Sequence, residues 1–408
     1  MKGLMDAFGD PYTSYMDPAM VRSLSDTTVG NFGGVGLSIS KAVESTPENP
    51  AYVVVASPIE GSPGHRAGIQ AGDLIVSIDG TSTPEITMDD VLSLLRGEVG
   101  TDVDLIIRRG KNMEFPVTLT RALIEVPTVK FGMIDDVGYL RIIEFTPQTP
   151  SRVQEALDSF ISSGFAGLII DLRSNPGGLI SSVVEVADKF IDSGPIVSTK
   201  SRHPYENSMY TASPKKTTMP KNIPIVVLID RGSASASEIL SGALKDNHLA
   251  YLVGERTFGK GSVQNPIPLP NSDGIKLTIA RYYTPSDTNI DKIGIPPDLE
   301  VLFPELTEEE ENAYVELIKS SEVAKHVENN PNMTEADIAA FAKQLNKTYS
   351  LDERMLRRII RIECEKTREP SLYDLDYDIQ LKAALEVIKD KDFFNLIANA
   401  KTLKELQQ

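Results

Sequence analysis

Several residue types and patterns that mark common protein classes are scarce or missing in this chain. Its 408 residues include one cysteine, Cys364, so an internal disulfide framework and a cysteine-based zinc site are both excluded. No HExxH, EF-hand or paired-cysteine pattern occurs, and we expect neither a metal nor another cofactor. No apolar run approaches the roughly 18 residues that a membrane-spanning helix needs.

Basic residues are also in deficit. The chain has 41 lysines and arginines against 58 aspartates and glutamates, a formal net charge of −17 at pH 7. Because nucleic-acid binding depends on basic surface, this balance argues against a nucleic-acid partner. The length favours two or three domains.

The chain has no secretory signal at its start. Met1 to Phe8 instead resembles the end of an amphipathic helix. We therefore expect that a targeting segment has been removed.

Residues 31–121 alternate short β-branched runs with turns. Leu74 to Gly80 is predicted as a strand, and Thr87 to Asp90 as the capped start of a helix. The stretch Gly61 to Gly80 resembles the most specific segment of PDZ domains, which bind an extended peptide by strand addition and hold its terminal carboxylate with backbone N–H groups. The resemblance assigns this carboxylate loop to Gly34, Val35, Gly36 and Leu37. Alternatively, the glycines of this stretch only permit a β-bulge.

Residues 122–304 change to an α/β pattern. Buried strands are predicted at Gly167 to Leu172, Ile223 to Ile229 and Leu249 to Val253, and turns lead the first two into amphipathic helices. Such β-turn-α units build a mostly parallel sheet. A later alternating strand is predicted at Gly274 to Thr284.

The turn after the second strand carries a Ser-Ala repeat, from Gly232 to Glu238. A serine in such a turn is often only a helix N-cap. It can also act as a nucleophile, because a helix N-terminus favours developing negative charge and presents free N–H groups, here that of Ala236. The turn Asn175 to Gly178 has the same polarity, so an amide of Gly177 or Gly178 is a candidate second oxyanion donor. The alternative for that turn is a simple strand-to-helix connection.

A serine nucleophile needs a base, and the chain has four histidines. A helix of about twelve residues is roughly 18 Å long, which would place His248 far from Ser235. His203 stays open as an alternative. Lys260 is the better candidate, because its glycine-flanked loop follows the strand at Leu249 to Val253 and should leave the same edge of the sheet.

Lys260 would have to be neutral to act as a base. Burial must therefore lower its pKa from the ordinary value near 10.4. Gln264 follows in the same segment and could orient the amine. The alternative is that Lys260 is a solvated loop residue.

The segment Gly254 to Gly261 nearly spells a phosphate-binding loop. Gly261 stands where such a loop has the Ser or Thr that binds magnesium, and Pro266 and Pro268 prevent a helix from following. Nucleotide binding is therefore rejected.

Beyond Glu305 the chain is predicted to be helical and highly charged. Thr334 to Asp337 and Ser350 to Glu353 are predicted as helix caps, and Met355 to Cys364 carries an apolar stripe. We interpret residues 305–408 as a packing or dimerisation module, through which copies could form a homo-oligomer.

Six motifs together resemble the C-terminal processing peptidases, also called tail-specific proteases, which use Ser-Lys chemistry. They occur in the family's order: Gly9 to Tyr15, Gly61 to Gly80, Asn175 to Gly178, Gly232 to Glu238, Phe258 to Gln264 and Gly294 to Asp298. The resemblance implies an α/β fold with a crotonase- or Clp-protease-like core. Its expected parts are residues 1–30 as an N-terminal segment of the catalytic region, 31–121 as an inserted PDZ domain, 122–304 as the protease core and 305–408 as a helical C-terminal region.

The resemblance also implies site residues and partners. It makes Ser235 the nucleophile, Lys260 the base and Gln264 its orienter. The oxyanion hole would comprise Ala236 with Gly177 or Gly178, and Asp246 matches a supporting acidic position. The expected substrates are proteins or peptides with free C-terminal tails, and the expected location is the periplasm or cell envelope.

Two rival functions stay open at this point. One is a non-catalytic PDZ scaffold with a degenerate protease core, and the other is a serine protease with a histidine base. We further hypothesise that Lys260 is misplaced at rest and becomes aligned when a tail docks on the PDZ domain.

Overall fold

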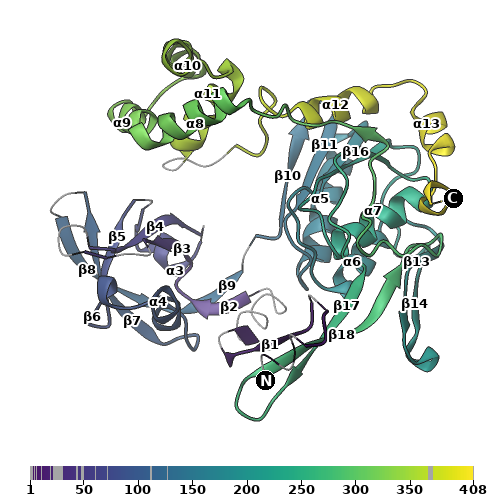
Figure 1. The fold of residues 1–408 in the computed structure, drawn as a ribbon, viewed down its shortest axis with the longest axis horizontal. Coiled ribbons are helices and arrows are strands. Elements are labelled where there is room, and N and C mark those ends of the chain that lie inside the picture. The colour runs from purple at the N-terminus through teal and green to yellow at the C-terminus, as the bar shows by residue number, and fades with distance from the viewer. Residues whose placement is uncertain are drawn as a thin grey trace. The chain divides into compact units, whose positions relative to one another are not determined.

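The chain divides into two compact units (Figure 1). The computed structural model describes residues 3, 5, 7–10, 12–18, 20–21, 31–42, 45–46, 50–59, 61–70, 72–110, 113–125, 127–365 and 371–407. Unit 1 combines Met1–Gly30, Pro127–Phe303 and Asp378–Gln408, and unit 2 combines Asn31–Val126 and Pro304–Tyr377. The region 305–408 is thus divided between the units. The helix end expected at Met1 to Phe8 lies in part outside the described residues.

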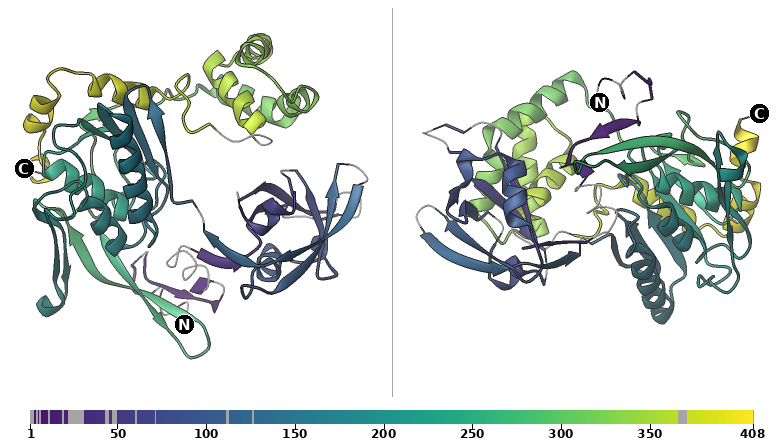
Figure 2. Two further views of the ribbon diagram at one scale, coloured as in Figure 1. Left: turned by 180° about the vertical axis from the view of Figure 1, so that it is seen from behind. Right: turned by 90° about the horizontal axis from the view of Figure 1, so that it is seen from below.

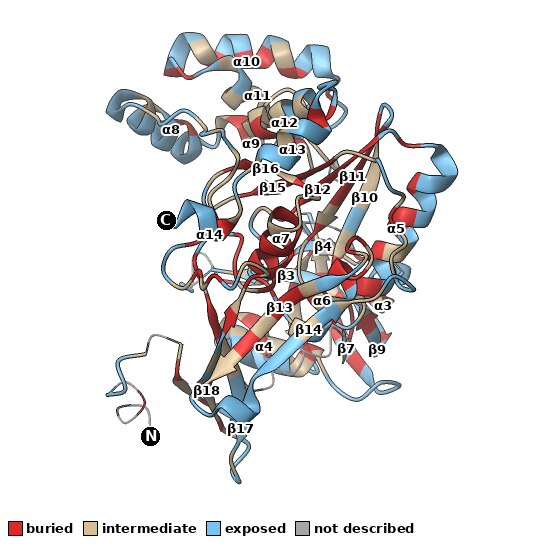
Figure 3. Cartoon of the chain, turned by 90° about the vertical axis from the view of Figure 1, so that its right-hand side faces the viewer, coloured by how far each residue is buried: buried red, intermediate tan, exposed pale blue. Residues whose placement is uncertain are grey.

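A six-stranded, mostly parallel sheet forms the centre of unit 1. Its order is β10 (Val129–Ile134), β11 (Val137–Ile142), β12 (Gly167–Asp171), β15 (Ile225–Ile229), β16 (Tyr251–Gly254) and β19 (Leu299–Glu300). β10 pairs antiparallel with β11, and the other pairs are parallel. β12 and β15 are buried along their whole length (Figure 3), as expected for strands covered on both faces. The predicted buried strands are confirmed, with ends shifted by one or two residues.

Helices cover this sheet and complete the core of unit 1. α5 (Thr149–Ser163), α6 (Ile180–Ala187) and α7 (Ala236–Asp246) pack against one another in chain order. α12 (Ile379–Ile388) packs on β12, β15 and β16, and α13 (Phe393–Asn399) and α14 (Leu403–Leu406) follow it. Because β12 and β15 are parallel neighbours, the turns that follow them leave the same edge of the sheet.

A second sheet of unit 1 is built around β18 (Gly274–Tyr283), which confirms the strand predicted there. β18 forms an antiparallel hairpin with β17 (Ser262–Pro268) and also pairs with β1 (Ser14–Met16) and β13 (Gly194–Ser201). β13 pairs in turn with β14 (Ser208–Ala212), and a short 3-10 turn, η2 (Pro204–Glu206), joins the two. Figure 2 shows β1 lying along the β17–β18 hairpin.

Unit 2 contains a small β-rich part. Its sheet has the order β3 (Leu37–Lys41), β4 (Val53–Pro58), β5 (Leu74–Ile78), β7 (Asp102–Arg109) and β8 (Met113–Thr120), with β6 (Thr81–Ser82) paired to β5. β2 (Asn31–Gly34) pairs with β9 (Ala122–Glu125), and the helical turns are α3 (Pro63–Arg66), η1 (Thr83–Glu85) and α4 (Met88–Leu95). Thr87 and Asp90 cap α4 reciprocally, which confirms the predicted helix start.

The other part of unit 2 consists of α8 (Glu308–Ser320), α9 (Glu322–Asn329), α10 (Glu335–Tyr349) and α11 (Glu353–Glu365). Thr334 and Asp337 form the predicted cap of α10, and the predicted stripe of α11 is confirmed by its buried members Leu356, Ile360 and Cys364. The cap predicted at Ser350 is wrong. Ser350 ends α10 in the left-handed region, at φ 53°, and the carboxylate of Asp352 instead accepts the first amides of α11.

Two further properties concern the described residues only. None of their helices has both the length and the apolar character needed to cross a membrane. No group of histidine, cysteine, aspartate and glutamate side chains within the described ranges could hold a metal ion.

Candidate active site

Ser235 lies at a sharp turn between β15 and α7. Its backbone angles, φ 54° and ψ −111°, belong to a region that residues with a side chain rarely adopt. Hydrogen bonds hold it there: its N–H donates to the Glu238 carboxylate at 2.9 Å, and its carbonyl accepts the amide of Ile239 at 3.0 Å. A non-glycine residue is thus kept in a strained conformation at the start of a helix.

The other two serines of the repeat are committed to structure. Ser233 donates its hydroxyl to the carbonyl of Leu172 at 2.8 Å, and Ser237 donates to that of Asn175 at 2.9 Å. Both are fully buried, whereas Ser235 is half-buried. Ser235 is therefore the one serine of the repeat that a substrate could reach.

The turn from Asn175 to Gly178 lies against the serine. A Cβ atom at Gly177 would come within 2.7 Å of the Ser235 Cβ and 2.9 Å of the Ala236 amide nitrogen, so this position requires glycine. Asn175 is buried, and it fixes the turn by donating to the Ile142 carbonyl at 2.8 Å.

The backbone amides at this turn differ in whether they have a hydrogen-bond partner. The Gly177 N–H donates to the Asn175 side chain at 2.8 Å. The amides of Gly178 and Ala236 have no partner among the residues that the structure describes. Of the candidate oxyanion donors, these two are the ones that remain available.

Glu238 joins the serine turn to the lysine loop, and we did not single it out from the sequence. Its carboxylate is fully buried and accepts the amides of Ser235 (2.9 Å), Gly259 (2.7 Å) and Lys260 (2.9 Å) and the hydroxyl of Thr257 (2.6 Å). Burial raises the pKa of Glu238, although these donors oppose the shift. The Ser-x-x-Glu capping pattern was the available signal.

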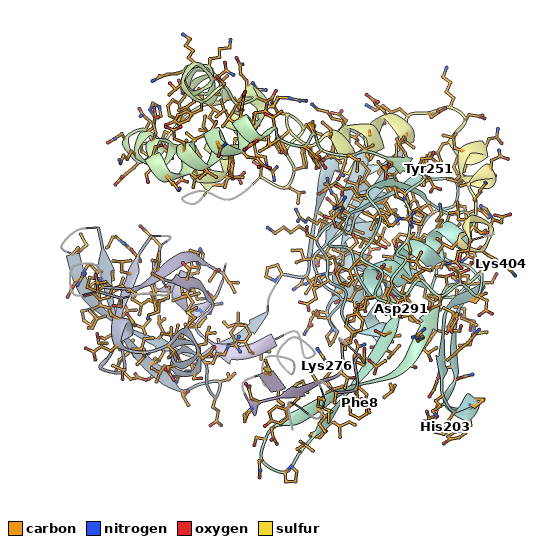
Figure 4. All side chains as sticks on the ribbon, in the orientation of Figure 1. Phe8, His203, Tyr251, Lys276, Asp291 and Lys404 are labelled. Atoms are coloured by element: carbon orange, nitrogen blue, oxygen red, sulfur yellow. The ribbon has the colours of Figure 1, made fainter. Side chains whose placement is uncertain are left out.

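Lys260 is half-buried beside this carboxylate. Burial lowers the pKa of its amine, with a further contribution from the charge of Lys276 on β18 and an opposing one from Glu238 (Figure 4 labels Lys276). The ammonium lies 5.5 Å from the centre of the Tyr12 ring. Within the described residues, no hydrogen bond joins the amine to the Ser235 hydroxyl.

Gln264 lies on β17, four residues after Lys260 in the chain. The described hydrogen bonds of its side chain are not to Lys260. Its amide nitrogen donates to the Ser262 hydroxyl at 2.8 Å and to that of Thr278 at 3.4 Å. Tyr282, fully buried on β18, donates its hydroxyl to the Lys260 carbonyl and closes the lysine loop against the sheet.

The histidines and Asp246 lie elsewhere. His203 stacks on Tyr205 at the end of the β13–β14 hairpin (Figure 4), and His248 follows the far end of α7, where Nδ1 lies 2.9 Å from the Ile397 carbonyl. Asp246 accepts the amides of Ser286 (3.1 Å) and Leu403 (2.8 Å), contacts that tie segments together. The described contacts of His203, His248 and Asp246 therefore do not include Ser235.

The predicted carboxylate loop of unit 2 adopts a tight turn before β3. Gly36 has φ 70°, and a Cβ there would lie 2.2 Å from that of Ser62. Its carbonyl accepts the amide of Ile59 and the hydroxyl of Ser62, and Val35 is buried. Leu37 opens β3, which pairs only with β4 in the described sheet, so the other edge of β3 offers free backbone groups.

The chain matches the family described as peptidase family S41 over residues 136–301 and a PDZ domain over residues 54–109. It is 39% identical over 355 residues to the carboxy-terminal-processing protease of Bartonella bacilliformis, covering 84% of this chain and 79% of that protein. The chain belongs to peptidase family S41. This confirms the predicted family, the assignment as a serine peptidase and the fold class of an α/β protease core with a PDZ domain and a helical C-terminal region.

Other similar proteins carry related names. The carboxy-terminal processing protease of Bacillus subtilis is 30% identical over 409 residues, covering 95% of this chain and 84% of that one. The carboxyl-terminal-processing protease of Synechocystis is 38% identical, with 72% and 68% covered. Among solved structures, the photosystem II D1 C-terminal processing protease is 33% identical with a TM-score of 0.46, covering 74% of this chain and 80% of that one.

Proposed function

We propose that the chain is a serine endopeptidase that recognises unstructured C-terminal tails through its PDZ domain and cleaves them with a Ser235–Lys260 pair. The observation that carries this proposal is Glu238, whose one carboxylate holds the amides of both Ser235 and Lys260. This shared acceptor holds the turn that carries the nucleophile next to the loop that carries the base. A non-catalytic scaffold would not need this arrangement.

The reaction begins with neutral Lys260. Its Nζ takes the hydroxyl proton of Ser235 while Oγ attacks the carbonyl carbon of the peptide bond. The amides of Ala236 and Gly178 stabilise the resulting oxyanion, and each such donor contributes several kcal/mol to the transition state. Lys260 then returns the proton to the leaving amine, which departs and leaves an ester on Ser235.

Water completes the cycle. Lys260 takes a proton from the water molecule that attacks the ester, and Ser235 regains its proton as the carboxylic acid leaves. Gln264 orients the amine during both steps. In the described state the amine lies 5.5 Å from the centre of the Tyr12 ring and makes no described hydrogen bond to the Ser235 hydroxyl, as expected if docking of a tail aligns it.

The same proposal covers partners and place. The edge of β3 and the loop from Gly34 to Leu37 would add a peptide tail as a further strand and hold its carboxylate. We place the protein in the periplasm or cell envelope; relatives include bacterial processing proteases and chloroplastic ones. The helices from α8 to α11 would provide a surface for homo-oligomers.

Ser235→Ala and Lys260→Ala test the mechanism. Each should reduce kcat on a disordered peptide with an apolar tail by at least roughly 10³-fold, because the nucleophile and the base act as one unit. Ser151→Ala and Lys221→Ala, on exposed surface, serve as matched controls and should cleave normally. Activity in Ser235→Ala at the wild-type rate, or its loss in His203→Ala or His248→Ala but not in Lys260→Ala, would contradict the proposal.

A further inference from the structure

The motif Gly9 to Tyr15 has so far no role, and the structure places it beside the lysine and its expected orienter. In unit 1, β1 adds antiparallel to β18, with Ser14 opposite Lys276. The Tyr15 hydroxyl donates to Asp273 at 2.6 Å, which fixes the segment to the turn of the β17–β18 hairpin. Tyr12 lies over the ammonium of Lys260. We call the described residues of Asp10 to Met16 the strap.

Asp10 is the polar centre of the strap. Its carboxylate accepts the Thr13 hydroxyl at 2.6 Å, the Thr278 hydroxyl at 2.5 Å and the Tyr12 amide at 3.2 Å. Burial opposes its ionisation, but these three donors and the amide of Thr13 outweigh burial and hold the pKa of Asp10 below its ordinary value. Asp10 is therefore an anion at neutral pH and can only accept hydrogen bonds.

This anion decides the direction of the next hydrogen bond. The Thr278 hydroxyl donates its single hydrogen to the carboxylate of Asp10. The hydroxyl oxygen can therefore only accept a hydrogen bond from its other neighbour, Gln264. The Gln264 amide nitrogen must then face Thr278. A reversed amide would bring its carbonyl oxygen against a hydroxyl oxygen that has no proton to give.

The fixed direction has a consequence for the other end of the amide. The Gln264 carbonyl oxygen is left without a partner in the described part of the chain, and an oxygen is the atom that can accept from an ammonium. A reversed amide would not suit the proposed role of Gln264, because N–H groups and a charged amine are both donors. Ser262 does not settle the choice, because its hydroxyl can donate or accept.

We propose that Asp10 is a positioning residue for the peptidase reaction: through the Thr278 hydroxyl it fixes the amide of Gln264 so that the carbonyl oxygen is presented to Lys260. This inference rests on the proposed roles of Lys260 and Gln264. It gives the N-terminal strap a function in catalysis, in which Asp10 acts through Thr278 and Gln264 and not directly on the reacting atoms.

The pH profile separates this role from a merely structural one. The Gln264 carbonyl stabilises the ammonium of Lys260 more than the neutral amine, so its loss favours the amine and lowers the pKa of Lys260. The other groups that face Lys260 are Lys276 on β18, Glu238 on α7 and the Tyr12 phenol, and Asp10→Asn removes none of them. Asp10→Asn should thus lower the plateau of kcat about tenfold and move its rise with pH to lower pH.

A double-mutant cycle between Asp10→Asn and Gln264→Ala is the decisive experiment. kcat and KM are measured on a disordered peptide with an apolar tail, across pH. If Asp10 acts through Gln264, the double variant should be no slower than Gln264→Ala alone. Thr278→Val should reproduce Asp10→Asn, and Thr278→Ser, which keeps the hydroxyl, should restore the wild-type profile. Asp17→Asn, an exposed carboxylate in the same segment, is the matched control and should leave kcat unchanged.

The outcomes distinguish this inference from the proposed function. If the effects of Asp10→Asn and Gln264→Ala multiply, or if Asp10→Asn changes the melting temperature without moving the pH profile, Asp10 is only structural and the inference is overturned. The Ser-Lys mechanism would survive that result. Wild-type activity in Lys260→Ala would instead overturn the mechanism itself, and the inference with it.

Discussion

The carboxylate of Glu238 accepts hydrogen bonds from both the serine turn and the lysine loop. Replacing one of its oxygens by NH₂ should be enough to separate these two segments. In Glu238→Gln the amide NH₂ must face either the amides of Ser235 and Lys260 or the donors of Thr257 and Gly259. Buried donors then lose their acceptor, which costs about 2 kcal/mol of unfolding free energy. Displacement of the lysine loop by about 1 Å should reduce kcat roughly 100-fold.

Denaturant unfolding and peptide cleavage measure both effects on the same preparation. Glu155→Gln, an exposed residue on α5, is the matched control and should change neither quantity. Full activity in a destabilised Glu238→Gln protein would show that the carboxylate supports only the fold.

Single residues also show how far sequence reasoning reaches. Ser235 and Lys260 were predicted because each stands in an unusual turn after a buried strand. Glu238 was not predicted as a site residue, because its capping pattern indicates only a local role. Its hydrogen bonds from Thr257 and Gly259 depend on β15 and β16 lying side by side. Asp10 escaped for the same reason, since its partner Thr278 is far along the chain.

At the scale of elements, ion pairs join the start of α12 to the end of β12. Arg173, just after β12, binds Asp378 at the start of α12 through two hydrogen bonds of 2.7 and 2.8 Å and also binds the buried Asp171. Burial opposes the charge of Asp171, but Arg173 holds the pKa of that carboxyl below its ordinary value of 3.8. The turn with Gly177 and Gly178 follows directly, so this cluster supports the turn that carries a proposed oxyanion donor.

Asp378→Ala tests that support. Removing one member of a largely buried ionic cluster should lower the unfolding free energy by about 3 kcal/mol and reduce kcat. Glu386→Ala, an exposed residue on the same helix, should change neither stability nor kcat.

The stability of the wild type should also depend on pH through Asp171. The contribution of Asp171 to the unfolding free energy is complete above its ordinary pKa and is lost as pH falls through the lower pKa of the folded state. Unchanged stability from neutral pH to pH 3 would contradict this account.

Elements were predictable where a local pattern determines them. β12 and β15 are continuous apolar runs, and α4 and α10 carry complete capping boxes. β17 was not predicted, because Pro266 and Pro268 were used only to exclude a helix. Prolines are tolerated on an edge strand, which β17 is. The cap at Ser350 was wrong because Asp352 competes for the same amides.

For the whole molecule, the proposed division of labour assigns tail capture to unit 2 and bond cleavage to unit 1. Replacing residues 31–126 by a short flexible linker should raise KM for a tail-bearing protein at least about tenfold, because capture raises the effective concentration of the cleavage site. The same substrate with an amidated C-terminus is the control, and its KM should stay unchanged since it lacks the carboxylate. Equal losses for both substrates would argue against carboxylate capture.

Short peptides without a tail test the coupling hypothesis in the same deletion protein. If tail docking aligns Lys260, their kcat should differ from that of the full chain. An identical kcat would show that the two units act independently.

Unit 1 is assembled from three separate stretches of chain, and this has a consequence for biosynthesis. While the ribosome is still adding unit 2 helices, Ser235 and Lys260 have been made, but Arg173 and Asp171 lack Asp378, and α12 does not cover the sheet. Domains form as units during synthesis, and this one cannot close until the segment from Asp378 onward emerges. The order of synthesis thus delays completion of unit 1, with α12 on its sheet, until the residues of unit 2 have been made.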